Sequence, residues 1–210
     1  MKVAILSESK ADDAAIKVLI QGILRREVEV LPRRARTGGW PEVFRLVPPT
    51  LKELHYHRSA EVLIVVVDTD DSPLHEEAHE RPAGFQPQCR VCELTRIVDQ
   101  IRPTLKPIPN RPDIKVAIAA AAPAIEAWYA HGLDPGCTDA GWILQTRAKK
   151  SAKIVVKRLK RLVYGSDRPG TERQVQKAVE HATRLVADIE LLERAFPQSL
   201  GLLIRTIRGW

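Results

Sequence analysis

The stretch "EVLIVVVDTDDSPLH" (residues 61–75) decides the fold class of this chain. Residues 61–68 form a nearly continuous aliphatic and β-branched run, which is typical of a central strand buried on both faces of a sheet. Three aspartates, a proline and a histidine follow this run at once. Functional residues of open α/β sheets gather at the carboxyl ends of the strands, so we expect a functional site at this point.

Three other segments have strand character: "KVAIL" (2–6), "VEVLP" (28–32) and "IKVAIAAAAP" (114–123). Helical spacing of apolar residues separates these segments, over 7–24, 42–57, 92–102 and 124–132. Pro48 and Pro49 should break or kink the second of these helices. Strands that alternate with helices predict an α/β fold with a mainly parallel, Rossmann-like sheet flanked by helices.

The chain divides into two expected parts. Residues 1–146 form the α/β domain, with an irregular insert over 69–92, and residues 147–210 form a basic helical C-terminal extension. The final segment "SLGLLIRTIRGW" is amphipathic, so it should dock on the body of the protein or on a second copy in a homodimer.

The net charge of the chain indicates which kind of partner it would bind. The 210 residues include 33 Lys and Arg against 26 Asp and Glu, a net charge of +7, which favours an acidic partner such as nucleic acid. No apolar run reaches membrane-spanning length and the N-terminus lacks signal-peptide character, so we expect a cytoplasmic protein without a membrane partner. The sequence has neither a Walker A motif nor a GxGxxG motif, which argues against a P-loop NTPase or a dinucleotide enzyme.

Acidic residues follow three of the expected strands. They are Glu8 after the first, Asp68, Asp70 and Asp71 after the third, and Glu126 after the fourth. Parallel neighbouring strands would bring these carboxylates together, where they would repel one another unless a cation were present. Oxygen ligands of this kind suit Mg²⁺ or Mn²⁺, and such ions promote phosphodiester cleavage. The alternative is that the aspartates only form a turn and cap the next helix.

The insert carries a second group of metal ligands. His75, His79, Cys89 and Cys92 lie within 18 residues, with the two histidines at i and i+4 on one expected helical face and the cysteines as Cys-x-x-Cys. Four such ligands suit tetrahedral zinc, and a closed set of four protein ligands predicts a structural zinc. The alternative is a mobile loop with ordinary surface histidines.

The segment "RAKKSAKIVVKRLKR" (147–161) has eight basic residues and no acid. As one helix it would present cations to phosphates, and the candidate nucleic-acid contacts are Lys149, Lys150, Lys153, Lys157 and Arg158. The alternative is a solvated helix face. Trp40 could stack on a base or pack on its own domain, beside a second basic cluster that includes Arg33, Arg34 and Arg36.

The segments "VAILSES…AAIKVLIQGIL" and "LIVVVDTDD" resemble the TOPRIM superfamily, which has a glutamate after its first strand and Asp-x-Asp after a later one. The likeness is closest to small stand-alone bacterial TOPRIM-like proteins, related to overcoming-lysogenisation-defect nucleases, which often carry an "IEAW" segment such as residues 125–128. It implies Mg²⁺ at Glu8, Asp68 and Asp70, with Glu8 as general acid or base, and a place in antiviral defence with a protein partner. Ser9 stands where many members have glycine, and the Cys/His loop is an addition.

Three functions therefore remain open. The first is a Mg²⁺-dependent TOPRIM-like nuclease that cleaves DNA or RNA, with catalytic candidates Glu8, Asp68, Asp70, Asp71 and Glu126. The second is a non-catalytic nucleic-acid- or protein-binding subunit of a larger complex. The third is a metal-dependent phosphotransfer enzyme that acts on a small nucleotide.

Overall fold

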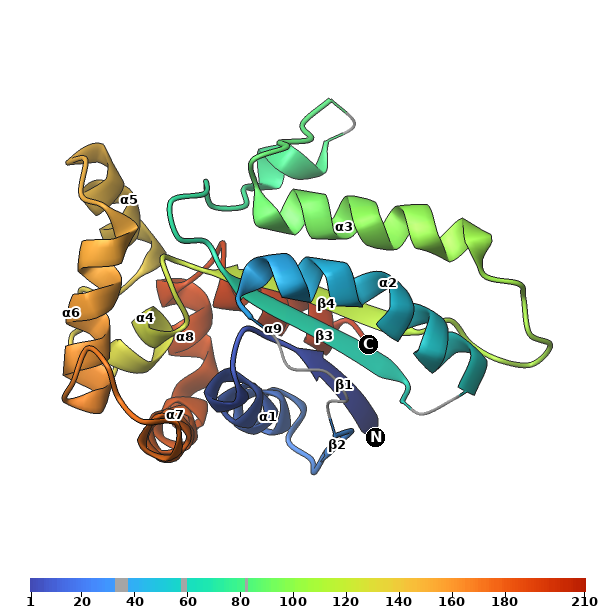
Figure 1. The fold of residues 1–210 in the computed structure, drawn as a ribbon, viewed down its shortest axis with the longest axis horizontal. Helices are drawn as coiled ribbons and strands as arrows, with labels where there is room; N and C mark the ends of the chain where they lie inside the picture. The colour runs from blue at the N-terminus through green and yellow to red at the C-terminus, as the bar shows by residue number, and fades with distance from the viewer. Residues whose placement is uncertain (33–37, 58–59, 82) are drawn as a thin grey trace.

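The structure, a computed structural model, describes residues 1–32, 38–57, 60–81 and 83–210. Its centre is a sheet of four parallel strands in the order β2-β1-β3-β4 (Figure 1). The strands are β1 (Lys2–Leu6), β2 (Glu29–Val30), β3 (Val62–Asp68) and β4 (Lys115–Ala121). All four expected strands are present and the predicted parallel sheet is confirmed.

The pleat of the central strand divides the protein interior into two cores. Val62, Ile64 and Val66 of β3 lie in one apolar cluster, and Leu63, Val65 and Val67 lie in the other. Alternate side chains of a strand point to opposite faces, so a strand covered on both sides must be apolar throughout. This is why residues 62–67 read as an unbroken apolar run.

Helices cover both faces of the sheet (Figure 1). Helices α2 (Trp40–His57) and α3 (Arg90–Ile101) pack on one face and against each other. Helices α1 (Lys10–Leu24) and α9 (Leu200–Arg208) pack on the other face, with α7 (Thr171–Leu185) against α1.

Helix α2 continues through both of its prolines, so of the break or kink predicted at Pro48 and Pro49 the break is excluded. Each proline removes one backbone donor from the helix. The buried residues Val43 and Val47 precede the pair, and Leu51 continues the same apolar face after it. Burial of this face on both sides of the prolines keeps the helix in one piece.

The C-terminal part is helical, as expected, but the basic segment 147–161 is not one helix. Helix α5 (Asp139–Arg147) ends before the lysines, Lys149 adopts a left-handed φ of 55°, and α6 (Ala152–Tyr164) begins after Ser151. The remaining elements are α4 (Glu126–Ala130), α8 (Ile189–Ala195) and the 3₁₀ turns η1 (Glu77–Glu80), η2 (Arg102–Thr104) and η3 (Val186–Asp188). Two exposed lysines, Lys149 and Lys150, therefore lie in a connection.

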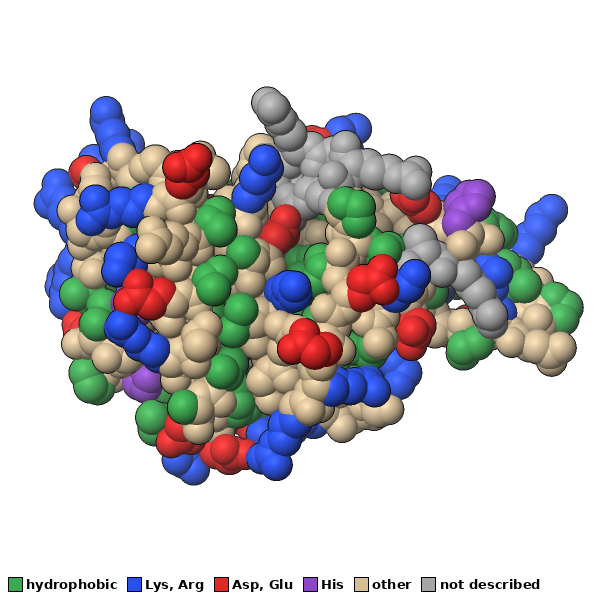
Figure 2. All heavy atoms as spheres, turned by 90° about the horizontal axis from the view of Figure 1, so that it is seen from below, with side chains coloured by type: hydrophobic (Ala, Val, Ile, Leu, Met, Phe, Trp, Pro, Cys, Tyr) green, Lys and Arg blue, Asp and Glu red, His purple; other side chains and the backbone are tan. Residues whose placement is uncertain are grey.

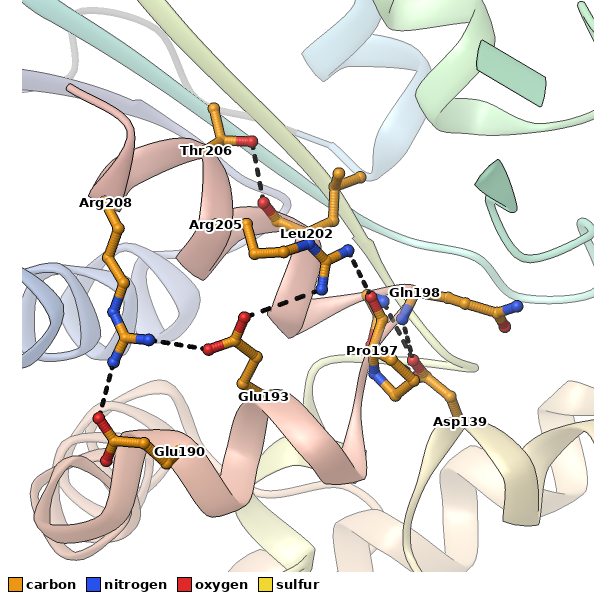
Figure 3. Close-up of polar contacts among 10 residues, drawn as sticks. Asp139, Glu190, Glu193, Pro197, Gln198, Leu202, Arg205, Thr206 and Arg208 are labelled. Carbon is orange, nitrogen blue, oxygen red and sulfur yellow. Dashed lines mark hydrogen bonds and ion pairs between the residues drawn. The ribbon is translucent and has the colours of Figure 1, made fainter. Parts of the chain in front are cut away.

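The last helix docks on the body of its own chain. The apolar residues of α9 are buried in the same cluster as Ile64 of the central strand. Figure 3 shows the polar contacts at its rim, where Arg208 pairs with Glu190 and Glu193 at 3.0 and 2.8 Å. Asp139 accepts backbone N–H bonds from Gln198 and Ser199 just before α9. The C-terminal helices thus share the core of the sheet.

Candidate metal centres at the carboxyl end of the sheet

Glu8 and Asp68 meet at the carboxyl ends of two adjacent strands. β1 and β3 are neighbours in the sheet, and Glu8 Oε1 accepts a hydrogen bond of 2.8 Å from the backbone N–H of Asp68. The backbone N–H of Trp40, at the start of α2, also donates to the Glu8 carboxylate. Burial raises the pKa of Glu8 above its ordinary value, although both hydrogen bonds oppose that rise. The convergence expected from the strand order is present for this pair.

The side chain of Asp68 points into a buried group of acids. Its Oδ1 accepts the backbone N–H of Ile125 at 2.9 Å. Burial raises the pKa of Asp68 well above its ordinary value, and the charges of Glu126, Glu8 and Asp12 raise it further. We call Glu8, Asp12, Asp68 and Glu126 the acidic cluster. Without a cation, this cluster favours protonated carboxyls.

Asp12 is the member that sequence reasoning missed. Its residue is 9% exposed, and burial, followed by the charge of Glu126, raises its pKa to about 8. Its burial could have been predicted from the sequence spacing, because Asp12 lies four residues before Ile16 and seven before Leu19, on the buried stripe of α1. An acid on the apolar stripe of a helix faces the interior and not the solvent.

Residues of the C-terminal part complete the surroundings of the acidic cluster. Lys160 Nζ lies 3.8 Å from Glu126 Oε1, and Tyr164 forms a hydrogen bond with the Glu126 carboxylate. Burial raises the pKa of Glu126 despite the nearby lysine. The Tyr129 hydroxyl is buried close to Asp12, Glu126 and Asp68 and has no hydrogen-bond partner among the described residues.

Asp70 pairs with Arg90, and its charge still contributes to the raised pKa of Glu8, after burial. Its backbone is left-handed, with φ 48°, a region that aspartate tolerates better than most residues. Its Oδ2 pairs with Arg90 Nη2 at 2.8 Å, and Arg90 Nη1 donates to the backbone carbonyl of Asp68. The Arg90 guanidinium also lies 4.5 Å from the ring centre of Trp40. Sequence reasoning missed Arg90, and no pattern around it marks its role.

Asp71 has a structural role in this arrangement. Its Oδ1 accepts the backbone N–H of Ala152 at 3.0 Å, at the start of α6. A carboxylate in this position satisfies one of the free donors at a helix N-terminus. The alternative interpretation of an aspartate that caps a helix is therefore the one that the geometry shows for Asp71.

The four predicted zinc ligands lie together. The ligand atoms of His75, His79, Cys89 and Cys92 are all within 4.8 Å of one another, and we call them the His/Cys cluster. His75 Nδ1 is 3.6 Å from Cys89 Sγ and 3.5 Å from Cys92 Sγ. A tetrahedral zinc with usual bond lengths separates a sulfur ligand from a nitrogen ligand by about 3.6 Å. The spacing fits a tetrahedral metal ion.

The surroundings of His75 also suit metal ligation. Its Nε2 lies 3.4 Å from Glu80 Oε1, so the nitrogen that faces away from the cysteines has a carboxylate partner. Second-sphere carboxylates of this kind orient histidine ligands. Burial raises the pKa of Cys89 to about 11, so its thiolate needs a nearby cation. The expected shared helical face is wrong, since His79 lies in η1 and His75 precedes it.

One helical turn joins the two centres. Cys89 is the N-cap of α3 and Cys92 lies in its first turn, so Arg90 is held between two ligands of the His/Cys cluster. The same Arg90 contacts Asp68 and Asp70 at the carboxyl end of β3. The position of Arg90 beside Asp68 and Asp70 therefore depends on the conformation of the loop over 69–89.

Basic side chains gather at the end of the molecule that α5 and α6 form, on the left of Figure 2. Lys153, Lys157 and Arg158 are exposed on α6, and Arg158 pairs with Asp134 at 3.0 Å. Ile154 is 68% exposed, because the buried face of α6 is formed by Ala152, Val155, Leu159 and Val163. Arg33, Arg34 and Arg36 lie outside the described residues.

Trp40 packs on its own domain while part of its ring stays exposed. It makes an edge contact with Phe44 at 5.3 Å, and 37% of the residue remains accessible. No helix in the part of the chain that the structure describes is long and apolar enough to cross a membrane.

Comparisons of the chain with protein-family models, with curated proteins and with solved structures give no match. The resemblance to the TOPRIM superfamily therefore stays a prediction from the sequence motifs alone.

Proposed function

We propose that this protein is a Mg²⁺- or Mn²⁺-dependent nuclease of TOPRIM type that cleaves phosphodiester bonds of DNA or RNA. The supporting observation is the meeting of Glu8 and Asp68 at the ends of adjacent parallel strands, 2.8 Å from carboxylate to backbone N–H. Asp12 and Glu126 add further charge, and together these acids raise the pKa of Asp68. A hard divalent cation would relieve this repulsion.

The donors are oxygen atoms, the type that such an ion takes, although among the described residues only the His/Cys cluster brings three or more candidate ligand atoms together. Glu8 and Asp68 would hold it through carboxylate oxygens, and the buried Tyr129 hydroxyl offers a further oxygen without a partner among the described residues. When bound, the ion would stabilise the negative charge that develops on a phosphate during cleavage. Glu8 would also act as general acid or base in the cleavage. In this arrangement Asp70 acts through Arg90, whose guanidinium it orients.

The His/Cys cluster would bind zinc as a closed, structural site. Four protein ligands leave no position for water, so the metal would hold the loop and the first turn of α3 in place. The exposed Lys149, Lys150, Lys153 and Lys157 would contact phosphates.

The first experiment is a cleavage assay on single- and double-stranded DNA and RNA, with Mg²⁺ or Mn²⁺ and with mononucleotides included. Asp68→Asn is the test variant, and Asp113→Asn, which changes an exposed aspartate, is the matched control. We expect polymer cleavage by the wild type and the control, and a loss on the order of 100-fold in Asp68→Asn. Equal cleavage by both variants would refute the assignment. Activity on mononucleotides alone would identify the small-nucleotide phosphotransfer enzyme instead.

One observation favours a second candidate, a nucleic-acid-binding subunit without turnover. Asp70 is engaged by Arg90 at 2.8 Å, so Asp68 and Asp70 are not arranged as a chelating pair. This candidate predicts that the wild type binds nucleic acid, and that neither Mg²⁺ nor Mn²⁺ elicits cleavage. Binding should then be unchanged in Asp68→Asn and weakened in Lys153→Gln.

A further inference from the structure

Strand β4 is an edge strand of the sheet. It pairs with β3 along its length and has no strand on its other side among the described residues. The other edge of the sheet is the two-residue β2. Unpaired backbone groups on a strand of seven residues are a ready template for another strand.

The hydrogen-bond pattern shows which residues of β4 face outward. Lys115 N–H donates to Glu61, and Ala121 C=O accepts from Thr69 N–H, so residues of this parity bond to the β3 side. In a parallel pair, alternate residues direct both backbone groups to one neighbour. Val116 and Ile118 therefore direct their N–H and C=O groups away from β3. No backbone bond to either residue from outside the sheet is recorded in the described ranges.

A groove follows this open edge. One cavity of about 290 Å³ lies between α3 and α9 and is lined by Val98, Val116, Ile118 and Leu202. A second cavity of about 720 Å³ shares His75, Glu80, Leu202 and Thr206 with the first, so the two form one continuous groove. In the first cavity these four apolar side chains surround the open edge of β4, and apolar pockets beside an open strand edge are the combination that strand addition uses.

The two ends of the groove carry opposite charges. Glu77 and Glu80 lie at the carboxyl end of β4, because Glu80 contacts His75 beside the first turn of α3. Arg102, which bonds to the Ile114 carbonyl, and Lys115, which bonds to the Trp210 carbonyl, lie at the start of β4. Asp99 is the one acid among the α3 residues that line the groove.

We propose that β4 pairs with β4 of a second copy of this chain, antiparallel and around a twofold axis near Ile118. Antiparallel pairing sets the start of one strand beside the end of the other. Arg102 and Lys115 of one copy then face Glu77 and Glu80 of the other, and symmetry repeats the contact. Arg205 also lines the acidic end, where Glu193 and the Pro197 carbonyl are the partners of its guanidinium (Figure 3).

A second copy explains this surface better than an unrelated peptide. The charge pattern is self-complementary under a twofold rotation, and the pairing closes after two chains into one continuous sheet. A parallel addition would place like ends together and leave another edge open. The inference uses none of the residues in the acidic cluster, so it stands or falls independently of the nuclease proposal.

The test is the oligomeric state of the full zinc-loaded chain, by light scattering and sedimentation from micromolar to submillimolar concentration. Val116→Pro removes the outward N–H and leaves the bonds to β3 intact, and Val116→Thr is the control that keeps this donor. We expect dimers for the wild type and Val116→Thr. The dimer should weaken by about 30-fold in Val116→Pro, because symmetry removes two hydrogen bonds.

Hydrogen exchange on the wild type decides the matter if the proline variant loses its fold, as judged by circular dichroism. Amide protection at Val116 and Ile118 should rise with protein concentration. A wild type that stays monomeric, a folded Val116→Pro that dimerises like the wild type, or protection that is independent of concentration would each overturn the proposal.

Discussion

Replacement of Arg90 by methionine tests the connection between the two candidate centres. The Arg90 side chain is 9% exposed and makes three contacts: an ion pair with Asp70 at 2.8 Å, a bond to the Asp68 carbonyl, and a cation–π contact of 4.5 Å with Trp40. Methionine keeps most of the packing of the aliphatic part and removes all three polar contacts.

The expected cost follows from these contacts. A hydrogen bond that involves a charged group contributes about 1.5–3 kcal/mol, and a cation–π contact about 0.5–1 kcal/mol. The Asp70 side chain is 48% exposed, so solvent screens the ion pair and compensates part of its loss. We therefore expect Arg90→Met to lower the free energy of unfolding by about 2–3 kcal/mol.

The assay is urea unfolding of the zinc-loaded protein, followed by far-UV circular dichroism because Trp40 itself is perturbed. Arg96→Met is the matched control on the same helix. Arg96 is 42% exposed and, among the residues that the structure describes, pairs only with Glu93 one turn away, so its replacement should lower the free energy of unfolding by less than about 0.5 kcal/mol. If the two variants unfold at the same urea concentration, Arg90 does not join the centres as we infer.

Three further predictions follow from buried charges and from the metal. The pKa of Asp12 is about 8 in the folded protein and 3.8 ordinarily, so its contribution to stability is full below pH 3.8 and is lost as pH rises through about 8. Asp12→Asn should therefore flatten the loss of stability between about pH 4 and pH 8 in urea titrations without divalent cations, and an unchanged slope would contradict this. Removal of zinc by a chelator should expose residues 69–89 to proteolysis, with protection restored by Zn²⁺ but not by Mg²⁺; equal digestion before and after chelation would count against a metal there. Asp139→Ala removes three hydrogen bonds of 2.7–3.0 Å and should lower the free energy of unfolding by about 2–4 kcal/mol. Asp188→Ala, which removes an exposed helix cap, should lower it by about 1 kcal/mol. Similar losses for the two variants in chemical unfolding would contradict this ranking.

The sequence was sufficient for features that depend on a short local pattern. The apolar run over 62–67 identified the central strand, and strand alternation placed Glu8 beside Asp68. The four zinc ligands were recognised because their residue types are rare together and close in the chain. In each case one physical requirement determines the residue types at nearby positions. For the central strand it is burial on both faces, and for the His/Cys cluster it is a set of soft ligands for one ion.

Other features depend on tertiary contacts that no local pattern encodes. The prolines of α2 should end a helix by local rules, but burial of Val47 and Leu51 on either side overrides them. From the sequence, Asp70 could only be grouped with the nearby Asp68. In the structure, the left-handed turn at Asp70 directs its side chain to Arg90. The sequence did not predict the break between α5 and α6, because lysine occurs both in helices and in connections.

The placement of the His/Cys cluster within 18 residues has a consequence for the order in which the chain folds. Contacts between residues close in sequence form early, because closing a short loop costs little entropy. All four ligands have been synthesised once the chain reaches Cys92. The acidic cluster is complete only after Glu126, and Lys160 beside it follows later. The face of the sheet that α9 covers is closed only when this last helix has been made. A metal ion held by these four ligands would therefore organise the first turn of α3, with Arg90 in it, before all the residues around the acidic cluster have been synthesised.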